Sequence, residues 1–129
     1  MFFHVDTDSE LAVYDQIARQ IKFAVADGAM AEGELIPSVR ELAREHAINP
    51  NTVGRAYRQL QDDGVVEPVR GTGLAIARGA RRMCLDLRRQ LLGERLSKAL
   101  REALQAGLDA SEVQQLVTAE LRKLKRKSG

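Results

Sequence analysis

The sequence predicts a mainly α-helical protein with one small β-hairpin, an α+β fold. Apolar residues recur at helical spacing in five segments, and two short apolar runs flank a glycine turn near residue 71. The charge is also unevenly distributed. Residues 1–77 hold seven Lys and Arg and twelve Asp and Glu, a net of −5, whereas residues 78–129 hold thirteen and six, a net of +7. We therefore expect two parts with different roles, residues 1–77 and residues 78–129.

The first expected helix covers residues 11–26, with Asp8 or Ser9 as its cap and Gly28 as its stop. The apolar run at residues 2–5 before it predicts a strand or an arm. After a loop, Ser38 and Glu41 form a capping-box pattern that begins a short helix over residues 39–45.

A third helix begins after a short turn, with Asn49 as cap and Pro50 at its first position. It is expected to run to about residue 63 and to end at Gly64. Residues 65–69 and 74–77 then predict two strands joined by a tight turn at residues 70–73. Three helices followed by a hairpin, with a short turn between the second and third helices, form a winged helix-turn-helix.

The composition excludes several classes of protein. With 44% hydrophobic and 29% charged residues, the chain is expected to be soluble and globular. It has no run of eighteen apolar residues, so no membrane partner is expected. The single cysteine, Cys84, excludes an internal disulfide, and the first residues lack a secretory pattern; both favour the cytoplasm.

No motif of a common enzyme class occurs in the sequence. The phosphate loop G-x-x-x-x-G-K-[ST], the nucleophile turn G-x-S-x-G and the zinc motif H-E-x-x-H are all absent. The two histidines, His4 and His46, are far apart in the sequence. We therefore expect no catalytic residue, no metal and no cofactor.

The third helix has the two faces that a DNA-recognition helix needs. One face is apolar, and the other carries Asn and Arg, which pair bidentately with adenine and guanine. Arg70, at the tip of the hairpin, is placed to enter a minor groove. A polar face is also what a simple three-helix bundle would show to solvent, and that alternative stays open here. The residues expected to contact DNA are Ser38, Arg40, Arg44, Asn49, Asn51, Thr52, Arg55, Arg58, Arg70, Gly71 and Thr72.

Two further helices are predicted, one at residues 81–106 with a broad apolar stripe and one from residue 110. Two helices cannot bury that much apolar surface alone, so we expect a homodimer with a two-fold interface. A monomer in which these helices fold back on the winged part is the alternative. The residues expected at the dimer interface are Leu87, Leu91, Leu92, Leu96, Leu100, Leu104, Val113, Leu116, Val117 and Leu121.

Residues 28–43, GAMAEGELIPSVRELA, resemble the start of the winged-helix domain of the GntR family. Residues 48–60, INPNTVGRAYRQL, and the wing RGTG at 70–73 continue this resemblance. The NPNTV sequence and the short C-terminal part are similar to the YtrA-type subfamily. The resemblance implies a bacterial transcription regulator, usually a repressor, that binds a palindromic operator as a homodimer. It also implies a place beside ABC-transporter genes or a response to envelope stress.

The resemblance implies DNA contacts for Arg40, for the polar residues that open the recognition helix and for Gly71 of the wing. The chain departs from many relatives at Pro50 and from several at Gly54, where the relatives have a basic residue. A protein-interaction module with a coiled-coil-like helical dimer is the alternative function. A small-molecule effector in a pocket between the winged part and residues 81–106 is a weaker hypothesis.

Overall fold

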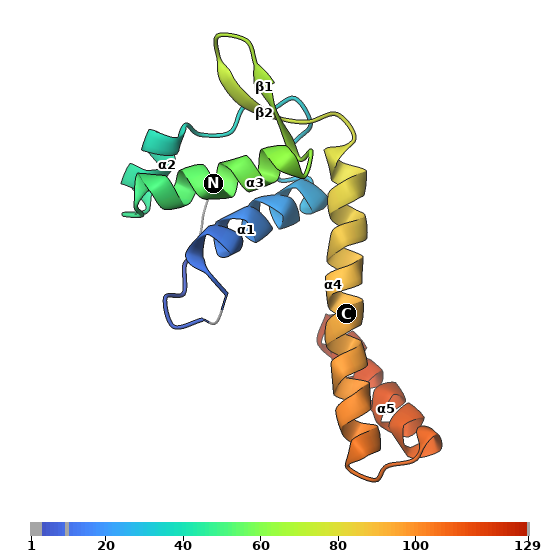
Figure 1. Ribbon diagram of the computed structural model, residues 1–129. Helices are drawn as coiled ribbons and strands as arrows, with labels where there is room; N and C mark the ends of the chain where they lie inside the picture. The colour runs from blue at the N-terminus through green and yellow to red at the C-terminus, as the bar shows by residue number, and fades with distance from the viewer. Residues whose placement is uncertain (1–3, 10, 129) are drawn as a thin grey trace. The chain divides into compact units, whose positions relative to one another are not determined.

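A computed structural model describes residues 4–9 and 11–128. Within them the chain forms five helices and one two-stranded antiparallel sheet (Figure 1), which confirms the predicted mainly α-helical fold with a hairpin. The elements are α1 (Val13–Asp27), α2 (Val39–Glu45), α3 (Pro50–Asp62), β1 (Val66–Val69), β2 (Gly73–Ile76), α4 (Ala80–Gln105) and α5 (Ala110–Ser128). The chain divides into two compact units, residues 1–88 and residues 89–129. The strand or arm expected at residues 2–5 lies partly outside the described residues, and His4 and Val5 belong to no strand.

The core of the first unit is formed by the apolar faces of its helices. Ile21 of α1, Leu42 of α2 and Leu60 of α3 are fully buried together. The start of α4 completes this core, because Ala80 and Cys84 are buried in the same cluster. The first turns of α4 therefore belong to the winged unit.

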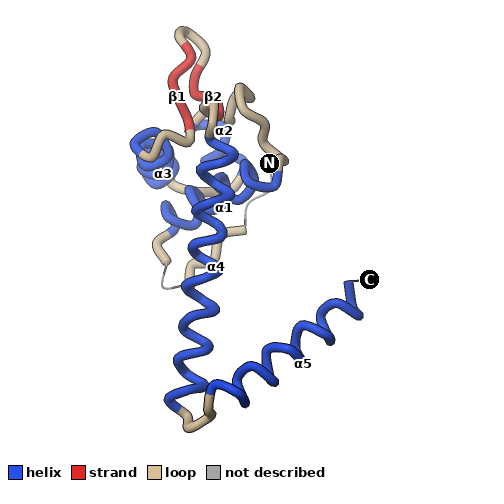
Figure 2. The backbone as a smooth tube through the Cα atoms, turned by 90° about the vertical axis from the view of Figure 1, so that its right-hand side faces the viewer, coloured by secondary structure: helices blue, strands red, loops and turns tan. Residues whose placement is uncertain are grey.

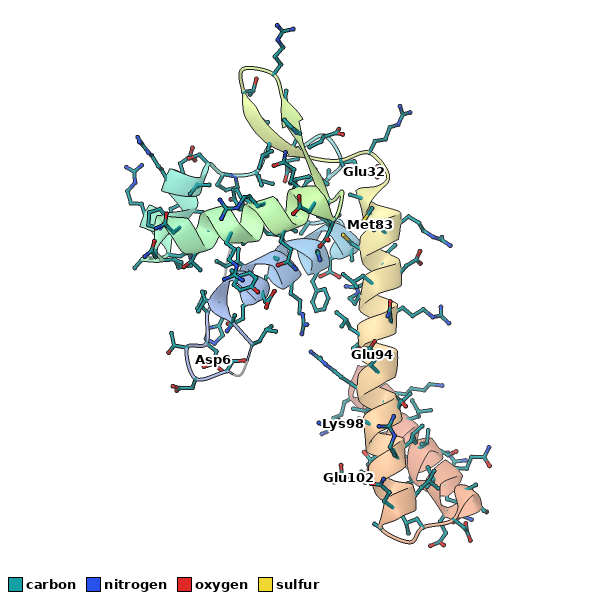
Figure 3. All side chains as sticks on the ribbon, in the orientation of Figure 1. Asp6, Glu32, Met83, Glu94, Lys98 and Glu102 are labelled. Atoms are coloured by element: carbon teal, nitrogen blue, oxygen red, sulfur yellow. The ribbon has the colours of Figure 1, made fainter. Side chains whose placement is uncertain are left out.

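The N-terminus of α1 differs from the prediction. The expected cap at Asp8 or Ser9 is wrong, because Ala12 is the N-cap residue and makes no side-chain capping bond. The amide of Gln16 instead organises the preceding segment. Its Oε1 accepts from the backbone N–H of Asp6 and its Nε2 donates to the Asp6 carbonyl, each at 2.8 Å. A buried glutamine thus ties the loop that carries Asp6 (labelled in Figure 3) to the helix.

The hairpin is anchored on the segment that precedes α2. Strands β1 and β2 pair from Val66 opposite Ile76 to Val69 opposite Gly73. The other edge of β2 pairs with residues 34–36, since the Ile76 N–H donates to the Glu34 carbonyl at 2.9 Å. The sequence predicted only a loop there. This pairing fixes the wing relative to the start of α2.

The second unit has no core of its own. None of residues 89–127 is buried, and α5 diverges from α4 after the turn at Gly107 (Figure 2). The exposed fractions of Leu96, Leu116 and Leu121 are 57%, 51% and 51%. Among the described residues, no helix has both the length and the apolar character needed to cross a membrane.

The apolar residues of α4 lie on two sides of the helix and not on the single stripe expected. Leu87 and Leu91 follow the buried Cys84 at helical spacing. A second row, starting at Leu92 and continuing through Leu96, is rotated by about 100° or more from the first, because an α-helix has about 3.6 residues per turn. Beyond Leu91 the first side becomes charged, with Glu94, Lys98 and Glu102 in one row (Figure 3).

Candidate nucleic-acid interface

Helix α3 presents a polar face that is held by a buried apolar face. Its inward residues are Val53, Ala56, Tyr57 and Leu60, all buried. Asn51 and Arg58 lie on the opposite side and are exposed. Asn49 caps the helix as predicted, with its Oδ1 accepting from the Asn51 N–H at 2.8 Å. The exposed N-terminal turn contains no acidic residue.

Helix α2 adds two basic side chains beside α3. Ser38 caps α2 as predicted, because its Oγ accepts from the Glu41 N–H at 3.1 Å. Arg40 and Arg44 lie one turn apart on α2 and both are exposed. Ser38 therefore serves as the cap of α2, from which Arg40 and Arg44 extend, and Asn49 serves as the cap of α3.

The wing supplies the third part of the surface. Arg70, Gly71 and Thr72 form its exposed tip, closed by a bond from the Thr72 N–H to the Val69 carbonyl at 2.9 Å. Gly71 has a φ of 75°, a left-handed conformation that favours glycine. In Figure 1 the wing and α2 lie above α3, and α1 lies below it.

No ion pair among the described residues holds the arginines of this surface. Arg40, Arg44, Arg58 and Arg70 make no ion pair with any residue that the structure describes. By contrast, Asp63 at the far end of α3 pairs with Lys22 at 2.8 Å. Unpaired exposed arginines are available to phosphates and base edges even though residues 1–77 are net acidic.

Tyr57 connects α3 to the start of α2. Its hydroxyl donates to the Pro37 carbonyl at 2.7 Å, and its ring is buried. Burial raises the pKa of Tyr57, and the nearby carboxylates of Glu41 and Glu45 raise it further. Tyr57 is therefore a neutral hydrogen-bond donor at physiological pH.

A groove of about 590 Å³ lies beside this bond, between the start of α2 and the wing. Its lining includes Ser38, Tyr57 and Thr72. The groove brings together two residues, Ser38 and Thr72, that were expected to contact DNA from different elements.

Arg55 is placed differently from the other arginines of the set. Its Cζ lies 3.9 Å from the centre of the Tyr14 ring, and its Nη2 donates to the Tyr14 hydroxyl at 3.3 Å. Sequence reasoning missed Tyr14, because nothing local marks a contact between residues 41 positions apart. Thr52, also in the expected set, is half-buried.

All of the residues expected at a dimer interface lie outside the core of the first unit. Leu87, Leu91, Leu100 and Val113 are half-buried, and Val117 is exposed. In α5, Val113, Leu116, Val117 and Leu121 follow the spacing of a single helical face.

Three helices, a turn between the second and third, and a wing that carries arginine define a DNA-binding protein of the winged helix-turn-helix class. A family profile described as "Bacterial regulatory proteins, gntR family" matches residues 13–76. The "HTH-type transcriptional repressor YtrA" of Bacillus subtilis is 33% identical over 113 residues, which cover 88% of this chain and 87% of YtrA. The chain belongs to the GntR family of bacterial transcriptional regulators, within which it is similar to the YtrA type. Proteins of this family regulate transcription and are not enzymes.

Solved structures share the fold. A transcriptional regulator from Oenococcus oeni is 29% identical and matches 93% of this chain and 99% of that chain, with a TM-score of 0.80. The DNA-binding domain of AraR, solved in complex with operator ORE1, is 22% identical over 60% of this chain and 94% of that chain. Its TM-score is 0.50, and this likeness shows a common fold only.

Proposed function

We propose that this regulator is a repressor that binds a palindromic operator as a homodimer, with α3 in the major groove and the wing in the minor groove. The four exposed and unpaired arginines Arg40, Arg44, Arg58 and Arg70 carry this proposal. They come from three separate elements, α2, α3 and the wing, and the first turn of α3 contains no acidic residue. The arginines of such a surface can bind both the phosphates and the base edges that line a DNA groove.

The homodimer is supported by the exposed apolar side chains of the second unit. Leucines that are about half exposed in α4 and α5 leave apolar surface that a second copy would cover. Two-fold symmetry would then place two recognition helices on successive major grooves, about 34–36 Å apart. A palindromic operator is the DNA counterpart of that symmetry.

Our proposals for the regulated genes and for the cellular location are inferred from the relatives. YtrA is named as a transcriptional repressor, which supports repression here. The YtrA-type resemblance favours an operon for an ABC transporter or for envelope stress. The cytoplasm of a bacterium is where such DNA is found, and we place the protein there.

Two other functions are distinguishable. A protein-interaction module would keep its binding in high salt, whereas operator binding would weaken by about one log unit per contacted phosphate for each tenfold rise in salt. A small-molecule effector would bind in the groove between α2 and the wing. A ligand there would compete with DNA for Ser38 and Thr72.

The first test is a gel shift on the DNA upstream of the protein's own gene, with excess unrelated competitor. A competitor-resistant shift at one inverted repeat is expected. Arg40→Ala and Arg58→Ala should each weaken operator binding by about 1–3 kcal/mol. Arg95→Ala, an exposed arginine on α4, is the matched control and should leave binding unchanged. Equal binding by all four proteins would exclude the proposed surface.

The dimer is tested by light scattering after size exclusion. The wild-type chain is expected at twice its monomer mass of 14.3 kDa. Leu96→Glu and Leu116→Glu place a charge on the apolar rows of α4 and α5 and should shift the mass toward the monomer. Ser97→Glu adds the same charge next to Leu96 on a polar position and serves as the control. A monomeric wild-type chain at micromolar concentration would contradict the proposal.

A further inference from the structure

The contact between Tyr14 and Arg55 joins α1 to α3 on the side of α3 that faces away from the wing. The Arg55 guanidinium lies over the Tyr14 ring at 3.9 Å and donates to its hydroxyl at 3.3 Å. Tyr14 is half-buried at the start of α1 and packs against the core. The ring therefore has a fixed place, and it restricts a long side chain that would otherwise sample many rotamers.

Helical spacing alone would not place the guanidinium there. Arg55 is four residues after Asn51 and three before Arg58, so the three share one side of α3. Within the described residues, the side chains of Asn51 and Arg58 form no hydrogen bond and no ion pair with α1. Arg55 alone turns toward α1, which lies below α3 in Figure 1, opposite the wing.

The contact leaves the charge of Arg55 free to bind an anion. The described residues provide no carboxylate partner for Arg55, whose side chain is exposed. A guanidinium stacked on an aromatic ring keeps its charge and has further N–H groups that can donate to an anion. This is the geometry in which arginine binds a phosphate.

A helix in the major groove has a sugar–phosphate strand on each side. The wing lies on one side of α3, and α1, whose Tyr14 contacts Arg55, lies on the other (Figure 1). We infer that Tyr14 is a positioning residue that holds Arg55 against a backbone phosphate at the edge of the major groove, so that Arg55 contacts no base. This inference rests on the proposed binding of DNA by α3.

The test uses a duplex selected by the wild-type protein from a random library, together with point variants of that duplex. Four proteins are compared with wild type: Tyr14→Leu, Tyr14→Phe, Arg55→Ala and the Tyr14→Leu/Arg55→Ala double variant. Circular dichroism and urea unfolding establish that each is folded at the assay temperature. Affinity is measured by fluorescence anisotropy over a range of salt concentrations.

Arg55→Ala should weaken binding by a similar factor on every duplex and lower the salt slope by about one. Tyr14→Leu should weaken binding by about two- to fivefold, the equivalent of the 0.5–1 kcal/mol of an exposed cation–π contact. Tyr14→Phe keeps the ring and should stay within about twofold of wild type. The double variant should bind like Arg55→Ala, because Tyr14 acts through Arg55.

Three results would overturn the inference. One is wild-type affinity and salt slope in a folded Tyr14→Leu protein. Another is an additional loss in the double variant beyond Arg55→Ala. The third is loss of discrimination at one base pair in Arg55→Ala, which would make Arg55 a base-reading residue. Failure of the wild-type protein to select any duplex would instead refute the proposed function itself.

Discussion

Tyr57→Phe removes one buried hydrogen bond and changes almost nothing else. The lost bond joins the Tyr57 hydroxyl to the Pro37 carbonyl at 2.7 Å, within a side chain that is 4% exposed. The ring remains, so the apolar packing of α3 is kept. A net loss of about 1 kcal/mol in the free energy of unfolding is expected at about pH 8.

The same substitution should change how stability depends on pH. Burial, together with Glu41 and Glu45, raises the pKa of Tyr57, whereas an unfolded tyrosine ionises near pH 10. Above about pH 10 the unfolded chain loses a proton that the native chain keeps, so the stabilisation present below that pH declines as pH rises. The decline reaches about 1.4 kcal/mol at about pH 11. Phenylalanine has no such proton, so the variant should equal or exceed the wild type in stability near pH 11.

Urea unfolding of both proteins from about pH 8 to about pH 11 measures this difference. Other groups that titrate at alkaline pH are common to both proteins and cancel in the comparison. Protomer concentration is held constant, because a dimer's stability depends on it. A gap between the two proteins that stays constant with pH would refute the assignment of a raised pKa to Tyr57.

Three further changes test other features. Gly54→Ala should raise the free energy of unfolding by about 1 kcal/mol in urea titrations, since the added methyl would meet no described atom within 4 Å beyond its chain neighbours and its own helix backbone. The same variant should weaken operator binding in the gel shift, and a destabilised variant would contradict the prediction. Ala47→Gly should raise the free energy of unfolding by about 0.5–1 kcal/mol, measured by thermal unfolding, because Ala47 has a φ of 51° in the turn before α3. No gain in stability would mean that this backbone conformation carries no strain. Cys84 is buried, and burial raises the pKa of its thiol against the smaller opposing effect of Lys22. Its alkylation should therefore be slow in the native protein and fast in denaturant, and equal rates would show that the core of the first unit does not cover Cys84.

The elements that the sequence predicted well are those with local signals. Ser38 with Glu41, and Asn49 with Pro50, mark the starts of α2 and α3 within four residues of chain, and both caps form as predicted. Gly28 ends α1 in a left-handed conformation for an equally local reason.

The features that the sequence could not predict depend on distant contacts. Residues 34–36 pair with β2 across about forty residues of chain, and no local pattern distinguishes that pairing from a loop. Gln16 holds the segment before α1 in place of the expected cap, because its buried amide reaches Asp6. The stacking of Arg55 on Tyr14 requires α1 and α3 to be packed first. The pairing of residues 34–36 with β2 and the stacking of Arg55 on Tyr14 give the candidate interface its detailed shape.

Gly54 shows how stability and DNA binding oppose each other in α3. It lies inside the helix, and an added Cβ would meet no described atom within 4 Å apart from its chain neighbours and the backbone of its own helix. Neither packing nor conformation within the chain therefore requires glycine, although glycine costs a helix about 1 kcal/mol relative to alanine. A glycine that destabilises a helix and that no contact within the chain requires indicates that something outside the chain requires it. Close approach of the α3 backbone to DNA would be such a requirement, and base contacts would then fall to Asn51 and Arg58 on either side of the glycine.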